Sequence, residues 1–327
     1  MNYYLLMFYI LLISSMLISI TASSWVVAWL GLEINMLSII TLMKNPNKPS
    51  SEEMIKYFTV QATASLMLMA SMIMYSSKMG MIDLQYLSLI SASSMLMMKM
   101  GMAPFHFWFP EVISGTEWSI CLLLMTLQKI TPSILLSFIS PSMTFVSIII
   151  TLSILVSSIQ SMDQTCLRKL FAYSSINNTG WMLPLIFMNL YSWMTYFIIY
   201  TIITTSVVIT LKNSKIFFMN QMNKLFHSNK NMKMFFSLSF MSMGGLPPFL
   251  GFLPKWMVVK TMVSNNMAML AAMMVILTLP MLFTYMRMII SNLSITTSES
   301  LKTNSAHYLS MMNFLTIYGL PIGMIFF

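Results

Sequence analysis

The sequence is short of charged residues. Only 8% of its 327 residues are charged, whereas an average soluble domain is about 25% charged. So few charges cannot cover a globular surface, which excludes a soluble enzyme or binding domain. The mean hydropathy is +0.79, and continuous apolar runs of about 20 residues recur along the chain, as membrane-spanning helices require. A membrane β-barrel would show short alternating segments instead. The expected fold class is an all-α polytopic membrane protein.

Groups that hold metals or redox cofactors are also scarce. The two cysteines, Cys121 and Cys166, lack metal-ligand spacing and are interpreted as small buried hydrophobes rather than a disulfide. No nucleotide- or phosphate-binding motif is present, and the longest expected loop, 212–233, is too short for a soluble domain. We therefore expect no site for hydride transfer, a flavin or an iron–sulfur cluster. The net charge of +9 does not indicate nucleic-acid binding, because the basic residues lie mostly between apolar runs.

Methionine, by contrast, is abundant, with 41 residues spread over every apolar run. Its flexible thioether fills cores well, and here it replaces isoleucine and leucine wholesale. This usage favours a gene read with a code in which an isoleucine codon specifies methionine, as in animal mitochondria. The N-terminal MNYYLLMFYILLISSM has neither a basic n-region nor a small-residue cleavage site. It is interpreted as a retained first span rather than a signal peptide.

The apolar runs predict eleven transmembrane helices. Their expected ranges are 3–20, 23–43, 56–76, 84–109, 117–139, 143–161, 169–188, 192–211, 234–263, 267–290 and 308–326. We expect residues 1–140 and 141–290 to form two five-helix repeats, followed by a loop and a terminal helix over 291–327.

Positive charges divide unequally between the two sides of this arrangement. The side that holds the N-terminus, with the adjoining span ends, carries twelve basic residues: Lys44, Lys48, Lys56, Arg168, Lys169, Lys212, Lys215, Lys224, Lys230, Lys233, Arg287 and Lys302. The opposite side carries only Lys78 and Lys260. Because basic loops remain on the cytoplasmic side or its equivalent, we expect the N-terminus in the mitochondrial matrix and the C-terminus in the intermembrane space.

Four charged residues remain in or beside the apolar runs, namely Glu33, Lys99, Lys129 and Lys255. Each ionised residue at the bilayer centre costs about 2.5–3.5 kcal/mol on insertion scales, so four together cost on the order of 10 kcal/mol. Such a cost favours a functional polar pathway inside the helix bundle. The alternatives are snorkelling to the membrane surface, or a buried Glu–Lys pair that only holds helices together.

Lysine suits proton transfer because burial disfavours its charged form and a nearby carboxylate restores that form. A buried lysine beside Glu33 is expected to change state as the carboxylate approaches or retreats. His106 either hydrogen-bonds within the core or relays protons, and both readings stay open. No second histidine lies at haem or metal spacing, which disfavours ligation. Glu111 and Glu117 are interpreted as solvated carboxylates near the matrix side.

Two helix-breaking motifs accompany these charges. GMAPF (residues 101–105) follows Lys99, and GLPPF (residues 245–249) precedes Lys255, so that both read G-x-x-P-F. Each falls in the fourth span of its five-span block. Glycine and proline leave backbone groups unpaired, and lipid cannot satisfy them, so such breaks belong beside a protein-lined polar cavity. Paired breaks at matching positions predict two inverted repeats with discontinuous fourth helices.

Several stretches together resemble a known family. WLGLEINMLSII, IKYFTVQATAS, MKMGMAPFHFWFPEV, LQKITP and GGLPPFLGFLPKW are similar, in order, to the chain 2 family of mitochondrial NADH:ubiquinone oxidoreductases. The resemblance covers roughly residues 20–290, and the methionine content is similar to that of invertebrate members. It implies an antiporter-like subunit in the membrane arm of respiratory complex I, in the mitochondrial inner membrane. Bacterial relatives have fourteen spans, and the eleven expected here are similar to the animal form.

The resemblance implies proton translocation coupled to NADH oxidation and ubiquinone reduction in other subunits. FMN, iron–sulfur clusters and ubiquinone would belong to those subunits, and this chain would hold no cofactor. The implied partners are other membrane-arm subunits, further antiporter-like chains among them, and membrane lipids such as cardiolipin. By the family's pattern Glu33 modulates Lys99, and Lys129 connects this half-channel to Lys255. His106 occupies the family's histidine position after the break.

Two other functions stay open. A free-standing cation/proton antiporter would share the lysines and the broken helices. The expected spans lack the first three of the fourteen in bacterial relatives, and we expect no extramembrane domain; both features favour a subunit among partners. The second is a structural helix bundle whose charges only fix helix register. Lys260 and Glu117 have no place in the family's pattern, and Lys260 leaves the proton exit route undefined.

Overall fold

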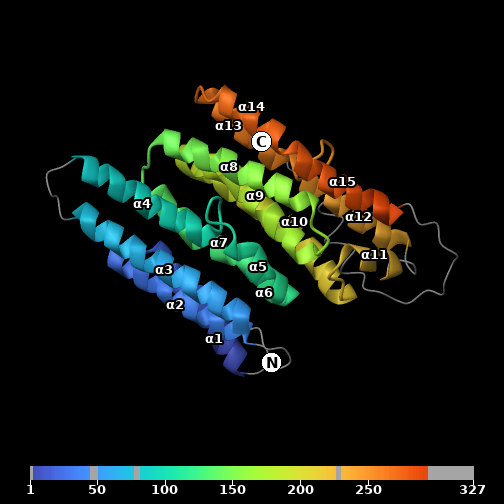
Figure 1. The fold of residues 1–327 in the computed structure, drawn as a ribbon, viewed down its shortest axis with the longest axis horizontal. Helices are drawn as coiled ribbons and strands as arrows, with labels where there is room; N and C mark the ends of the chain where they lie inside the picture. The colour runs from blue at the N-terminus through green and yellow to red at the C-terminus, as the bar shows by residue number, and fades with distance from the viewer. Residues whose placement is uncertain (1–2, 45–50, 77–81, 226–229, 294–327) are drawn as a thin grey trace. The chain divides into compact units, whose positions relative to one another are not determined.

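The computed structural model describes residues 3–44, 51–76, 82–225 and 230–293, and it is built of α-helices (Figure 1). The chain divides into two compact units, Met1–Ile149 and Ile150–Phe327, and the division falls within helix α8. The helices up to that division are α1 (Tyr3–Ile20), α2 (Trp25–Met43), α3 (Ser51–Ser76), α4 (Ile82–Met100), α5 (Trp108–Gly115), α6 (Trp118–Met125), α7 (Leu127–Ser137) and α8 (Met143–Met162). Those that follow are α9 (Leu167–Met188), α10 (Leu190–Ser214), α11 (Met219–Leu225), α12 (Lys230–Gly244), α13 (Phe252–Ser264), α14 (Ala268–Leu277) and α15 (Leu279–Leu293).

Small residues let α1 and α2 pack closely in the first unit. A Cβ atom added at Gly31 of α2 would lie 2.8 Å from the Cβ of Ser19 and 3.0 Å from the carbonyl oxygen of Ser15 on α1. Such close backbone approach is a common basis of helix association in lipid, where burial from water supplies no driving force. The hydroxyls of Ser15 and Ser19 donate to the carbonyls of Leu12 and Met16 in their own helix. Both hydroxyls are therefore satisfied without water.

An aromatic cluster forms part of the core of the second unit. The ring of Phe240 on α12 meets Phe236 edge to face, with centroids 4.7 Å apart. Its centroid also lies 6.0 Å from that of Phe171 on α9 and 6.3 Å from that of Tyr285 on α15. Aromatic pairs of this kind contribute about 0.5–1.5 kcal/mol beyond their burial. The cluster fixes α12, the helix that leads into the second G-x-x-P-F motif, against α9 and α15.

The expected loop 212–233 is largely helical, which corrects the sequence interpretation. Helix α10 runs to Ser214, and α11 follows. Between them the chain forms an antiparallel bridge in which the amide of Leu167 donates to the carbonyl of Phe217 at 3.0 Å. The amide of Met219 likewise donates to Thr165 at 3.2 Å. These hydrogen bonds tie the connection to the start of α9, a long-range pairing that local composition does not reveal.

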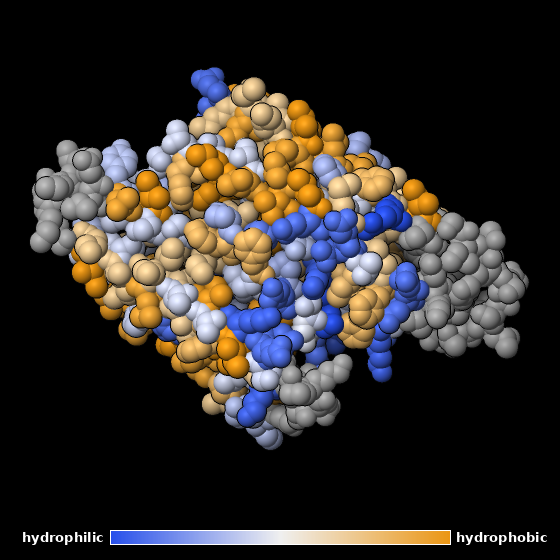
Figure 2. Space-filling view, in the orientation of Figure 1, coloured by the Kyte–Doolittle hydropathy of each residue, from blue (hydrophilic) through white to orange (hydrophobic). Residues whose placement is uncertain are grey.

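The surface and the helix lengths are those of a membrane protein. Within the described residues, seven helical segments are long and apolar enough to cross a membrane: Tyr3–Ile20, Trp25–Met43, Ser51–Ser76, Trp118–Ser137, Met143–Met162, Leu190–Ser214 and Ala268–Ile290. Hydrophobic side chains cover much of the visible face of the helices (Figure 2). The all-helical polytopic class is confirmed. The expected terminal span 308–326 lies outside the described residues.

Candidate functional site

The first G-x-x-P-F motif ends helix α4 with a specific cap. Gly101 takes φ +73°, and its amide donates to the carbonyl of Met98 at 3.0 Å. The amide of Met102 donates to the carbonyl of Met97 at 3.0 Å. This pair of hydrogen bonds is a Schellman cap, which needs a left-handed residue, usually glycine, just after the helix. Helix α5 then begins at Trp108, seven residues after the glycine.

The second motif repeats both the cap and the spacing. Gly245 takes φ +75°, and its amide donates to the carbonyl of Ser242 at 3.1 Å. The amide of Leu246 donates to Met241 at 3.4 Å. Helix α13 begins at Phe252, again seven residues after the glycine. The two motifs therefore interrupt their helices with the same backbone hydrogen bonds.

Lys99 lies in the last turn of α4, directly before the first break, and is only 6% exposed. It lines a cavity of about 10 Å³, which is about the space that one water molecule needs. The polar side chains that share this lining come from three further helices: Asn35 of α2, Tyr57 and Gln61 of α3, and Gln128 and Thr131 of α7. The lysine is thus surrounded by neutral polar groups inside an apolar bundle.

The amide side chains of this lining hold one another in place. Gln128 Nε2 donates to Asn35 Oδ1 at 2.7 Å, and the hydroxyl of Tyr57 donates to Gln128 Oε1 at 3.4 Å. Gln61 Nε2 donates to the backbone carbonyl of Lys99 at 3.4 Å. A connected network of this kind fixes the polar surface that faces the lysine.

Glu33 on α2 is partly buried and lies in the same unit as Lys99. No ion pair joins these two side chains, both of which lie in the described part of the chain. Glu111 of α5 does form an ion pair, with Lys56 of α3, in which Nζ and Oε2 are 2.7 Å apart and both side chains are about half exposed. Glu111 is thus solvent-exposed, as the sequence interpretation expected, and it also pairs with a lysine.

Lys129 and His106 are both buried in the first unit. Lys129 on α7 is 2% exposed, and its Nζ lies 5.1 Å from the centroid of the Phe109 ring, a cation–π geometry. His106 lies in the break between α4 and α5 and is 3% exposed, with its ring against Phe107. The amide of Phe109 donates to the carbonyl of His106 at 3.0 Å. The break thus places the histidine next to the aromatic residue that covers Lys129.

Lys255 lies in the first turn of α13 and is directed back at the second break. Its Nζ donates to the carbonyl of Gly244, the last residue of α12, at 2.8 Å. In a continuous helix that carbonyl would accept from residue 248, but Pro248 has no N–H. The negative end of the α12 dipole also favours the ammonium. A Cβ atom at Gly245 would lie 2.9 Å from this Nζ, so the glycine makes room for it.

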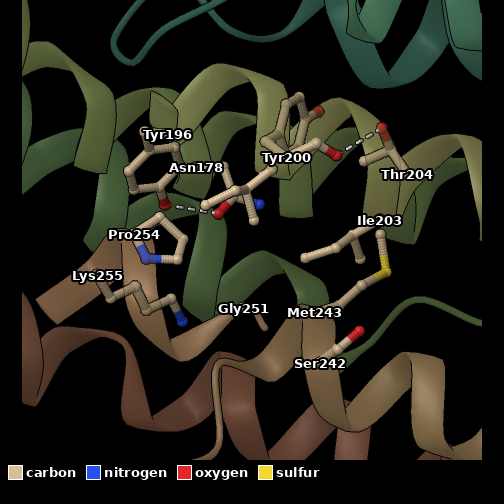
Figure 3. A pocket seen from close by; sticks show the side chains of 11 residues that line it. Asn178, Tyr196, Tyr200, Ile203, Thr204, Ser242, Met243, Gly251, Pro254 and Lys255 are labelled. Carbon is tan, nitrogen blue, oxygen red and sulfur yellow. Dashed lines mark hydrogen bonds between the residues drawn. The ribbon is translucent and has the colours of Figure 1, made fainter. Parts of the chain in front are cut away.

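A second cavity, of about 20 Å³, adjoins Lys255 and has room for a water molecule (Figure 3). Besides Lys255, its polar lining residues are Asn178 of α9, Tyr196, Tyr200 and Thr204 of α10, and Ser242 of α12. The hydroxyl of Tyr196 donates to Asn178 Oδ1 at 3.0 Å. As at Lys99, a lysine, a helix break and a small polar cavity coincide.

Comparison with known proteins identifies the family. The model for NADH:quinone oxidoreductase/Mrp antiporter, TM, matches residues 22–284. The sequence is 41% identical to NADH-ubiquinone oxidoreductase chain 2 of Anopheles gambiae, over 98% of this chain and 97% of that protein. The chain belongs to the NADH-ubiquinone oxidoreductase chain 2 family. The chain 2 protein of Lemur catta is also 41% identical, over 84% of this chain and 81% of that protein. The resemblance found in the sequence is confirmed.

Solved structures share the fold of this chain 2 family member. A chain in the structure of respiratory complex I from Thermus thermophilus with bound aureothin aligns with a TM-score of 0.87 and 19% identity, covering 99% of this chain and 79% of that chain. A chain of the Mrp complex from Dietzia sp. DQ12-45-1b aligns with a TM-score of 0.77 and 14% identity, covering 91% and 62%. At such identities the likeness shows the fold alone.

The structure places Glu33, Lys99, Lys129 and His106 in the first unit and Lys255 in the second. The sequence interpretation of this chain 2 family member missed several neutral polar residues that line the two cavities, among them Asn35, Tyr57, Gln61, Gln128 and Tyr196. A signal existed for some of them, because amides are costly in apolar spans. Asn35 and Gln128 also lie within two residues of Glu33 and Lys129. Among the described residues, no group of three or more His, Cys, Asp or Glu side chains is placed to hold a metal ion.

Proposed function

We propose that the chain moves protons across the mitochondrial inner membrane through Lys99, Lys129 and Lys255. As a chain 2 family member it is an antiporter-like, multi-pass membrane subunit of NADH:ubiquinone oxidoreductase, respiratory complex I. NADH oxidation and ubiquinone reduction in other subunits supply the energy, and FMN, the iron–sulfur clusters and ubiquinone belong to those subunits.

The observation that carries the proposal is the coincidence of lysine, helix break and polar cavity at Lys99 and again at Lys255. A helix break in lipid leaves backbone groups that only protein or water can satisfy. An ionisable side chain at the same depth is costly and marks an ion or proton path. A break that serves only packing needs no lysine beside it.

The residues take different parts in this path. In the first unit Glu33 adjusts the charge on Lys99 through space, and Lys129, under the ring of Phe109, takes the proton onwards. His106 extends the polar line at the break. Lys255 completes the path in the second unit. These are the roles that the family's pattern implies, and the buried or partly buried positions of the side chains are consistent with them.

The finer architecture is part of the proposal. Two inverted five-helix repeats over 1–140 and 141–290, with discontinuous fourth helices and a terminal helix, would bring the total to eleven. The matching caps and seven-residue connections of the two breaks support this arrangement. The N-terminus would face the matrix and the C-terminus the intermembrane space. The partners are other membrane-arm subunits, further antiporter-like chains and lipids such as cardiolipin.

The test is NADH-driven proton pumping by reconstituted complex I carrying Lys99→Met or Lys255→Met, measured together with NADH oxidation. We expect both variants to lose at least about tenfold in pumping, because an apolar side chain cannot carry charge across the break. Lys260→Met is the matched control, since Lys260 lies on the same helix as Lys255 and is exposed. Normal pumping by assembled Lys99→Met and Lys255→Met complexes would refute the proposal.

A free-standing cation/proton antiporter is the second candidate, and the fold shared with the Mrp complex is the observation that favours it. The near-complete match to chain 2 proteins favours the complex I subunit. Native electrophoresis separates the two, because a complex I subunit migrates with NADH dehydrogenase activity. Migration away from that activity would favour the antiporter.

A further inference from the structure

The hydrogen bonds around Asn178 run in one direction. Asn178 Nδ2 donates to the carbonyl of Ser174 one turn earlier, at 2.9 Å. Its amide is thereby oriented so that Oδ1 is the atom that accepts from the hydroxyl of Tyr196, at 3.0 Å. A phenol has one hydrogen to donate and lone pairs to accept with. Because the hydrogen of Tyr196 is committed to Asn178, its oxygen serves any further partner as an acceptor.

From this arrangement we propose that Tyr196 is a positioning residue for Lys255, an inference that rests on the proposed function. When the Lys255 ammonium leaves the carbonyl of Gly244, the oxygen of Tyr196 accepts its hydrogen bond, through a water molecule in the cavity. The Lys255 ammonium thus has two alternative hydrogen-bond acceptors, the carbonyl at the end of α12 and the phenol oxygen of Tyr196 on α10. Because Asn178 accepts the hydrogen of the Tyr196 hydroxyl, the oxygen of Tyr196 stays available as an acceptor.

The lining of the cavity explains why a phenol takes this part. The ionisable groups that line it are Lys255, Tyr196 and Tyr200, and none of the lining residues is a carboxylate. A cation that moves here therefore needs a neutral oxygen as its partner. The hydroxyl of Tyr200 points away from Lys255 in Figure 3, whereas that of Tyr196 lies beside Asn178 on the side of Pro254 and Lys255.

The first experiment compares Tyr196→Phe with Tyr200→Phe in reconstituted complex I. Each removes one buried hydroxyl from the same helix and cavity and keeps the ring. A hydrogen bond to a charged group is strong enough for its loss to lower NADH-driven pumping about tenfold, so we expect this fall for Tyr196→Phe and a clearly smaller fall for Tyr200→Phe. The alkaline limb of the pumping pH profile should also move to lower pH in Tyr196→Phe alone, because the ammonium loses an acceptor. Equal pumping and equal pH profiles in the two variants would overturn the inference.

A second pair keeps the inference testable if Tyr196→Phe fails to assemble. Asn178→Leu frees the hydroxyl of Tyr196 to turn its hydrogen toward the cavity and should lower pumping severalfold. Asn178→Gln keeps a neutral amide acceptor for that hydroxyl and should restore part of the pumping. The same activity in both Asn178 variants would contradict the inference. Lys255→Met serves as the reference. Normal pumping by this variant would refute the proposed function itself. Loss of pumping by Lys255→Met together with normal pumping by Tyr196→Phe would refute only the role of Tyr196.

Discussion

The two helix breaks have the same backbone conformation but differ in the positions of their charged side chains. Each has a glycine at φ near +75°, the same pair of capping hydrogen bonds and a seven-residue connection to the next helix. The lysine, however, precedes the first glycine by two residues and follows the second by ten. At the position ten residues after Gly101 the chain carries Glu111, and two residues before Gly245 it carries Met243.

The surroundings of the two lysines differ as well. Lys99 has amide side chains around it, and in the proposed function the carboxylate of Glu33 adjusts its charge. Lys255 has tyrosines, an asparagine and a free helix carbonyl. The comparison indicates that the repeat lies in the backbone interruption, which supplies a place for polar groups. The ionisable groups that use that place differ between the units.

The largest effect of a substitution is expected at Gly251, where the second break leaves no space for a Cβ atom. A Cβ atom at Gly251 would overlap the carbonyl oxygen of Ser242, a backbone atom that cannot move aside. Gly251→Ala should therefore abolish assembly of complex I, as judged by native electrophoresis. Gly244→Ala is the control, because its added Cβ would find only Tyr285 at 3.6 Å, an ordinary contact. Normal assembly of Gly251→Ala would show that the break is less rigid than the structure indicates.

The next effect tests the carboxylate that only the first site possesses. Glu33→Gln removes a charge that acts on Lys99 across a partly polar region, so pumping should fall about three- to tenfold. In a double-mutant cycle with Lys99→Met the second substitution should add little, because both act on one group. Strictly additive losses, measured as pumping rates, would mean that Glu33 works independently of Lys99.

A smaller effect is expected in the amide network that only the first cavity contains. Asn35→Leu leaves Gln128 without its 2.7 Å partner, and an unsatisfied buried amide costs about 1–3 kcal/mol. The variant complex should lose activity faster on heating, whereas the double variant Asn35→Leu with Gln128→Leu should recover part of the loss. Equal rates of thermal inactivation in the wild-type complex, the Asn35→Leu variant and the double variant would show that the network contributes little to stability.

The smallest effect is expected at Glu111, although it occupies the position of Lys255 in the first break. Its ion pair with Lys56 is half exposed, and pairs of that kind contribute little because water screens them. Glu111→Gln should change pumping by less than about twofold. A loss as large as that of Lys255→Met would show that the two positions are functional counterparts and that the charges repeat after all.

The sequence alone predicted the class of the protein, the two breaks and the burial of Lys99 and Lys129, because glycine, proline and charge are conspicuous in apolar runs. It did not predict that the expected span 117–139 is divided at Thr126, where φ is −114° and ψ is −81°. Pro132 lies further along, inside α7, so no helix breaker marks that point. Tyr196 was missed for another reason: tyrosine is ordinary in membrane helices, and only packing shows which hydroxyl lies near a lysine.

Pro248 has a consequence for how the Lys255 site can be lost. Any residue with an N–H at this position would compete with Lys255 for the carbonyl of Gly244, since it lies four residues on, where an α-helix makes its next hydrogen bond. Because proline has no N–H, an added turn of helix could not hydrogen-bond the carbonyl of Gly244, and this acceptor stays available to Lys255. Pro104 stands in the same relation to the carbonyl of Met100. In both units one imino acid keeps a backbone oxygen out of the helix ladder and open to other donors.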